Sequence, residues 1–174
     1  MTSLQHYLRP LLAPASVALV GASDKPATLG RIVYENLLEG GFKGELYPVN
    51  PNHRRLLGRR CFPSLDAIGK PVELLLIAVP CAAVSGVLDD GARCGVKAAV
   101  ILSAPPADDG DARRWQREIL ATARKRRIRL LGPHAFGVIR TDIGLNATMG
   151  SGLALPGRLA LVAQSGAVCT AMLN

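Results

Sequence analysis

The residues in this chain that are best placed for chemistry lie where an apolar run ends on a glycine. The run from Ser16 to Val20 meets Gly21, and a small polar turn then leads into a helical pattern that reaches Ile32. A strand that ends on glycine leaves room for a bulky anion, and the following helix presents unpaired backbone N–H groups and a positive dipole end. This arrangement favours binding of a phosphate group at the turn.

The turn departs from the dinucleotide-binding pattern G-x-G-x-x-G, because the next glycine after Gly21 is Gly30. The second apolar run, residues 45–49, also ends without the acidic residue that commonly binds the ribose hydroxyls of NAD. It is followed instead by Asn50-Pro51-Asn52-His53-Arg54-Arg55. Cations there suit a ligand with a phosphate on its ribose, which leaves NADP or coenzyme A. That Arg54 and Arg55 are ordinary loop charges is an equal alternative.

Alternating apolar and amphipathic segments must position these residues. Strands are predicted over 16–21, 45–49, 73–79, 97–102 and 128–131, with helices over 29–39, from Pro80 to about Cys94, and around Trp115 to Ala123. The continuous apolar run 73–79 is typical of a strand buried on both faces. The pattern predicts an α/β fold with a Rossmann-like, doubly wound parallel sheet, whose strand ends place the candidate loops along one edge.

The C-terminal segment follows a different pattern. Residues 152–157 contain Pro and Gly and resemble a hinge, and residues 158–173 begin a fresh strand, turn and helix. We therefore expect one domain over residues 1–151, with residues 152–174 as the hinge and first strand-turn-helix of a truncated second, flavodoxin-like domain.

Composition narrows the function classes. The 174 residues are 49% hydrophobic and 4% aromatic, which disfavours nucleic-acid modules that stack bases on aromatic rings. The net charge of +8 favours an acidic ligand, although the basic run 124–129 also fits a solvated helix end. Four cysteines show no metal-like or disulfide spacing, and no apolar run is long enough for a membrane span. We expect a cytoplasmic protein with no metal, nucleic-acid or membrane partner.

Five short motifs occur along the chain: VGASDKP at 20–26, YPVNP at 47–51, AVP at 78–80, GPHAFGV at 132–138 and AQSGA at 163–167. In this order they resemble the CoA-binding domain of the NDP-forming acyl-CoA synthetases. That family includes the alpha subunit of succinyl-CoA synthetase and protein-lysine acetyltransferases with a synthetase-like region. The resemblance covers nearly the whole chain.

The resemblance implies which residues would bind coenzyme A. The turn from Ser23 to Pro26 would cradle phosphates, with Ser23 as an N-cap-like hydroxyl, and His53 or Arg54 would meet a phosphate after the second strand. The loops around Val79 and Ser103 would flank the adenine and the pantetheine arm. The full set of candidate residues is Gly21, Ala22, Ser23, Asp24, Lys25, Pro26, Asn50, Pro51, His53, Arg54, Val79, Pro80, Ile101, Leu102, Ser103, His134 and Ala135.

One motif departs from the family pattern G-P-N-[CS]-x-G. Here His134 stands in place of the usual Asn, and Ala135 in place of Cys or Ser. The resemblance implies that this loop lies where the thioester end of CoA arrives, so the departure leaves the acyl group open.

The resemblance also implies partners. CoA or acyl-CoA would be the ligand, and ligase and ATP-grasp domains, in cis or in trans, would supply the remaining chemistry. The phosphorylated histidine of the family would lie beyond Asn174, so we expect no catalytic residue here and no complete synthetase reaction by this chain alone. An NADP-dependent oxidoreductase domain and a nucleotide-sensing Rossmann module are the alternatives, and a homo-oligomer is left open.

Overall fold

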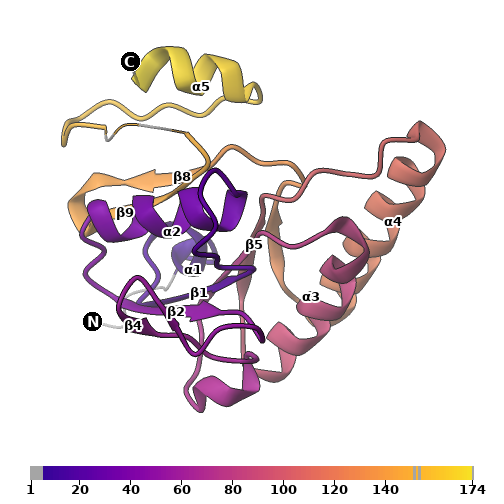
Figure 1. The fold of residues 1–174 in the computed structure, drawn as a ribbon. Coiled ribbons are helices and arrows are strands. Elements are labelled where there is room, and N and C mark those ends of the chain that lie inside the picture. The colour runs from indigo at the N-terminus through magenta and orange to yellow at the C-terminus, as the bar shows by residue number, and fades with distance from the viewer. Residues whose placement is uncertain (1–5, 151, 153, 174) are drawn as a thin grey trace.

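A five-stranded parallel sheet forms the centre of the molecule (Figure 1). The computed structural model describes residues 6–150, 152 and 154–173. The strands of the sheet are β1 (Ser16–Val20), β2 (Glu45–Val49), β5 (Leu74–Ile77), β6 (Ala98–Ile101) and β7 (Arg129–Leu131). They lie in the order β2-β1-β5-β6-β7, with every adjacent pair parallel. This confirms the Rossmann-like, doubly wound α/β fold.

The two faces of the sheet bury alternate residues of each strand. Val17, Leu19 and Leu76 belong to one apolar cluster, whereas Ala18 and Leu75 belong to the other. Because both faces are covered, the strands are mostly apolar and do not alternate with polar residues, and Ser16, Glu45 and Arg129 are the first residues of their strands. Leu74 to Ile77 are fully buried, as the unbroken run predicts.

Helices cover both faces (Figure 1). On one face lie α1 (Arg9–Leu12) and α2 (Leu29–Glu39), and on the other lie α3 (Val84–Arg93) and α4 (Asp109–Arg126). Short 3-10 turns occupy Asp66–Ile68, Cys81–Ala83 and Thr141–Ile143. The basic run lies at the exposed end of α4, where Arg126 pairs with Asp89 at 2.8 Å.

Two small hairpins occur that the sequence patterns did not predict. The first, β3 (Arg55–Leu56) with β4 (Arg59–Arg60), occupies the loop after β2. The second, β8 (Gly137–Arg140) with β9 (Leu145–Thr148), packs against α2. Asn36 of α2, nine-tenths buried, donates from Nδ2 to the carbonyl oxygens of Thr148 at 2.9 Å and Gly150 at 2.8 Å. This amide fixes the end of the second hairpin to the helix.

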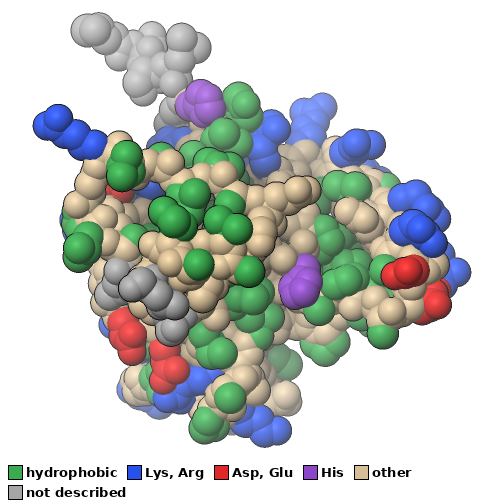
Figure 2. Space-filling view, turned by 90° about the horizontal axis from the view of Figure 1, so that it is seen from above, with side chains coloured by type: hydrophobic (Ala, Val, Ile, Leu, Met, Phe, Trp, Pro, Cys, Tyr) green, Lys and Arg blue, Asp and Glu red, His purple; other side chains and the backbone are tan. Residues whose placement is uncertain are grey.

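The strand expected at the start of the segment 158–173 does not form. Residues 154–165 form no regular secondary structure, and α5 (Gly166–Leu173) follows them. A strand is stabilised by hydrogen bonds to a neighbouring strand, and none of the described residues pairs with this segment. The side chains of Leu159 and Val162 are fully exposed, and hydrophobic side chains are prominent on the face that Figure 2 shows from above. The helix itself forms as predicted.

The expected domains span residues 1–151 and 152–174. Their limits at residues 1, 151 and 174 lie outside the described residues, because residues 1–5, 151, 153 and 174 are not described. Within the described part, no helix combines the length and the apolar character needed to cross a membrane.

We predict that Asn36→Ala lowers the free energy of unfolding by about 1–3 kcal/mol, because the buried carbonyl of Thr148 and the partly buried carbonyl of Gly150 lose their donor. Urea denaturation measures this change. Gln116→Ala is the control, since this amide is exposed on α4, and its effect should stay within about 0.5 kcal/mol. Equal effects of the two substitutions would contradict the role of Asn36.

Candidate functional site

A hollow of about 390 Å³ lies at the carboxyl ends of β1, β2 and β5. The chain runs from β1 to β2 on one side and then from β2 past β1 to β5 on the other, so the strand order reverses between β1 and β5. Open parallel sheets bind ligands at such a switch point, outside the strand ends. The hollow is lined by Val20, Gly21, Ser23, Thr28, Leu29, Gly30, Val49, Asn50, Pro51, Asn52, Ala78, Val79 and Pro80.

Two glycines bring the backbone of α2 against the end of β1. A Cβ atom on Gly30 would lie 1.8 Å from the carbonyl oxygen of Gly21. A Cβ atom on Gly21, whose φ is +93°, would lie 2.4 Å from the carbonyl oxygen of Ala78. Neither position accommodates a side chain, so the first turn of α2, with its free N–H groups, lies directly at the hollow.

The polar turn between β1 and α2 is held by its own hydrogen bonds. The Lys25 N–H donates to Ser23 Oγ at 3.0 Å, and Thr28 Oγ1 donates to the Lys25 carbonyl at 2.8 Å. Arg31 Nη1 donates to the Asp24 carbonyl at 3.1 Å. The N-cap residue of α2 is Thr28, so the expectation that Ser23 acts as an N-cap is wrong. Five residues of turn separate Ser23 from the helix, and its hydroxyl closes a local turn instead.

The loop after β2 is joined to this turn. Asn50 Nδ2 donates to the Ala22 carbonyl at 2.7 Å, while Asn50 Oδ1 accepts from the Asn52 N–H at 2.9 Å. His53 Nε2 lies 3.6 Å from Asp24 Oδ1. The side chain of Asn50 thus fixes one wall of the hollow relative to another, and the imidazole of His53 stands next to the polar turn.

The ends of β5 and β6 are joined by Ser103. Its hydroxyl donates to the Val79 carbonyl at 2.6 Å, with the Ile77 carbonyl at 3.3 Å, and the residue is 4% exposed. The hydroxyl is therefore occupied in holding the Val79 wall. The Ser103 carbonyl in turn accepts from the His134 N–H at 3.1 Å, which brings the loop after β7 to the same edge.

The structure separates the sequence candidates into three groups. Gly21, Ser23, Asn50, Pro51, Val79 and Pro80 line the hollow. Exposed or half-buried residues beside it or farther along the edge are Asp24, Lys25, Pro26, His53, Arg54, His134 and Ala135. The side chains of Ala22, Ile101, Leu102 and Ser103 are buried and do not line the hollow.

Sequence reasoning missed the part of the lining that comes from the start of α2. Thr28, Leu29 and Gly30 line the hollow but were not among the candidates. The signal was Gly30 itself, a glycine in the first turn of a predicted helix, where the dinucleotide pattern also places a glycine for close helix packing.

Cations gather on the β2 side of the hollow. The β3–β4 hairpin and the residues before it carry Arg54, Arg55, Arg59 and Arg60, all exposed. Burial raises the pKa of the nearby Cys61 thiol, which favours its protonated, unreactive form. The chemistry available here is electrostatic attraction of an anion, without a reactive nucleophile at Cys61.

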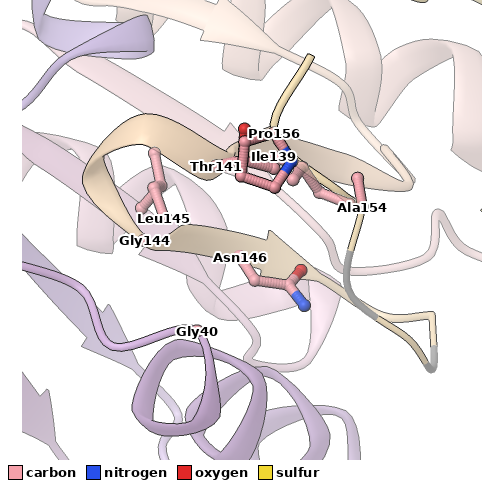
Figure 3. A pocket seen from close by; sticks show the side chains of 8 residues that line it. All are labelled: Gly40, Ile139, Thr141, Gly144, Leu145, Asn146, Ala154 and Pro156. Atoms are coloured by element: carbon pink, nitrogen blue, oxygen red, sulfur yellow. The ribbon is translucent and has the colours of Figure 1, made fainter.

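A second, smaller hollow of about 110 Å³ lies between the β8–β9 hairpin and the segment that follows it (Figure 3). Its lining comprises Gly40, Ile139, Thr141, Gly144, Leu145, Asn146, Ala154 and Pro156. None of these residues is charged, so this hollow lacks the cations that would attract a phosphate.

A family model for the CoA binding domain matches residues 15–141. The chain belongs to this CoA-binding family. The match spans the whole parallel sheet and all the residues that line the larger hollow, and it supports coenzyme A as the ligand.

Similar proteins are ADP-forming ligases. The chain is 39% identical, over 96% of its length, to the alpha subunit of acetate–CoA ligase [ADP-forming] I from Pyrococcus furiosus, and covers 37% of that protein. It is 31% identical, over 95% of its length, to 4-hydroxybutyrate–CoA ligase [ADP-forming] from Nitrosopumilus maritimus, of which it covers 24%. The chain therefore spans about a quarter to two fifths of the length of these relatives.

A solved structure has the same arrangement. The dinucleotide-forming acetyl-coenzyme A synthetase 1 of Ca. Korarchaeum cryptofilum, in complex with phosphate and ADP, superposes with a TM-score of 0.90 at 37% identity. The alignment covers 95% of this chain and 36% of that one. The fold and the family are thus the same as those of the CoA-binding domain of such synthetases.

We predict that Gly30→Ala destabilises the fold by about 1–3 kcal/mol or more, because the added Cβ meets backbone that cannot move aside. Gly86→Ala in α3 is the matched control: nothing lies within 4 Å of its Cβ position, and Ala should stabilise that helix by about 0.5–1 kcal/mol. Thermal or urea denaturation measures both. A neutral Gly30→Ala would show that the close approach is not required.

Proposed function

We propose that the hollow at the switch point binds coenzyme A or acyl-CoA, with the diphosphate at the turn between β1 and α2. The observation that carries this proposal is the packing of Gly30 on Gly21, which places the free N–H groups of α2 at the hollow. The contacts would come from Gly21, Ser23, Lys25 and the start of α2, with Asn50 holding the facing loop. Membership of the CoA-binding family supports the same ligand.

The charge distribution supports one orientation of the ligand. His53 and Arg54 lie on the β2 side of the turn, next to the arginine-rich β3–β4 hairpin. A phosphate on the ribose would lie toward these cations, because CoA carries about four negative charges at its nucleotide end. The neutral pantetheine arm would then run across the ends of β5 and β6, past Val79 and Pro80.

We further propose that the domain works within an NDP-forming acyl-CoA synthetase, with ligase and ATP-grasp domains in cis or in trans. The relatives named above are ADP-forming ligases, and this chain spans only part of their length. The exposed Leu159, Val162 and Met172 support a further domain packing on the C-terminal segment. In this role the chain supplies binding, and the nucleophile belongs to the remaining domains. A synthetase-like acetyltransferase would use the same CoA site.

We predict that CoA stabilises the chain by about 2.7 kcal/mol when present at about 100 times its dissociation constant. Thermal unfolding with CoA, acetyl-CoA, NADH and NADPH measures this effect. The two CoA compounds should raise the melting temperature and the nicotinamide nucleotides should not. Stabilisation by NADPH alone would contradict the CoA site and favour an NADP-dependent oxidoreductase domain.

We also predict that Arg54→Glu together with Arg55→Glu weakens binding of CoA by about tenfold or more, and weakens binding of dephospho-CoA less. Isothermal titration calorimetry measures both affinities. Arg124→Glu together with Lys125→Glu makes the same charge change at the far end of α4 and should have a much smaller effect. Equal losses for CoA and dephospho-CoA would mean that Arg54 and Arg55 act only through general charge.

A further inference from the structure

The edge of the sheet beyond the hollow differs sharply in charge from one end to the other. The segment 53–60, after β2, holds His53 and four arginines. Residues 102–107, between β6 and the N-cap residue Asp108 of α4, and residues 132–136, after β7, contain one ionisable side chain, that of His134. An elongated ligand with an anionic end and a neutral arm therefore fits this edge in one direction, with the end of its arm toward His134.

The backbone holds His134 rigidly at this position. Its N–H donates to the Ser103 carbonyl at 3.1 Å, and the Ala135 N–H donates to the Ile101 carbonyl at 3.1 Å. Gly132 packs so closely that a Cβ atom there would lie 2.5 Å from the carbonyl oxygen of Ile101. The turn is thus fastened to the end of β6, and Ser103 connects it to the Val79 wall of the hollow.

The imidazole of His134 is free to bind a ligand. The residue is exposed, and its ring makes no hydrogen bond or ion pair with any residue in the described part of the chain. Its φ of +53° lies in the left-handed region, which residues other than glycine rarely adopt. An imidazole offers an N–H donor in both its neutral and its protonated form.

We infer that His134 donates a hydrogen bond to an oxygen of the acyl group, so that the site prefers acyl-CoA to free CoA. This inference rests on the proposed function, because it places the pantetheine arm along β5 and β6. A free thiol is a weak hydrogen-bond acceptor, whereas the carbonyl of a thioester and a carboxylate on the acyl chain are good ones. Either oxygen can accept the hydrogen bond from the imidazole N–H of His134.

The test compares CoA, acetyl-CoA and succinyl-CoA by isothermal titration calorimetry on the 174-residue chain. One hydrogen bond corresponds to an affinity difference of about 3- to 10-fold. We expect at least one acyl-CoA to bind more tightly than CoA by this factor, and His134→Gly to remove the difference while the affinity for CoA stays within about twofold. Glycine suits the positive φ, so this variant deletes the imidazole without backbone strain.

The two acyl-CoA ligands show which oxygen His134 contacts. If acetyl-CoA already binds more tightly than CoA and the difference depends on His134, the oxygen is that of the thioester. If only succinyl-CoA shows this difference, the oxygen belongs to the carboxylate. His53→Gln is the matched control, since it should weaken all three ligands by the same factor. A preference that survives in His134→Gly, or the absence of any preference in the unaltered chain, would overturn the inference. Failure of all three ligands to bind would instead overturn the proposed function.

Discussion

The contact on which the site depends is the approach of one backbone to another where α2 meets the end of β1. Gly30 packs on the carbonyl of Gly21, and Gly21 packs on the carbonyl of Ala78, so three segments meet with no side chain between them. This contact sets the position of the first turn of α2 and leaves the hollow open in front of it. A larger residue at either glycine would separate the helix from the strand and remove the feature that a phosphate would bind.

Two buried or half-buried polar side chains then hold the other walls in place. Asn50 fastens the loop after β2 to the carbonyl of Ala22, and Ser103 fastens the end of β5 to the end of β6. Each of these side chains sets the position of backbone at the hollow. The edge of the sheet is consequently a fixed surface, with its cations on the β2 side and an apolar stretch toward β7.

The parallel sheet could be predicted because its strands are apolar on both faces and are separated by helical patterns. Strand β2 and helix α2 were predicted at their observed bounds, since Gly40 and Gly41 end the helix and Pro48 lies within an edge strand. The hairpin of β8 and β9 was not predicted, because it is held by packing on α2 and by hydrogen bonds from Asn36, more than a hundred residues away in sequence. The strand expected at the start of the segment 158–173 has the apolar residues of a strand, but none of the described segments pairs with it.

The glycines and cations of the candidate site could be predicted from the sequence. Which polar side chains form hydrogen bonds within the protein could not. The family resemblance implies a binding role for Ser103. Its hydroxyl instead donates a hydrogen bond to the Val79 carbonyl, which the sequence alone does not show. Thr28, not Ser23, is the N-cap of α2, because it is the residue directly before the helix.

In the proposed complex CoA places its diphosphate at the start of α2. The most direct measurement is a titration of ¹⁵N-labelled protein with CoA, followed through the backbone amide resonances. We predict the largest shifts at the backbone N–H groups between Gly21 and Gly30, where every residue except Pro26 has one, and smaller shifts between Asn50 and Arg54. Shifts confined to other parts of the chain, such as the uncharged hollow beside Gly40 and Gly144, would contradict it.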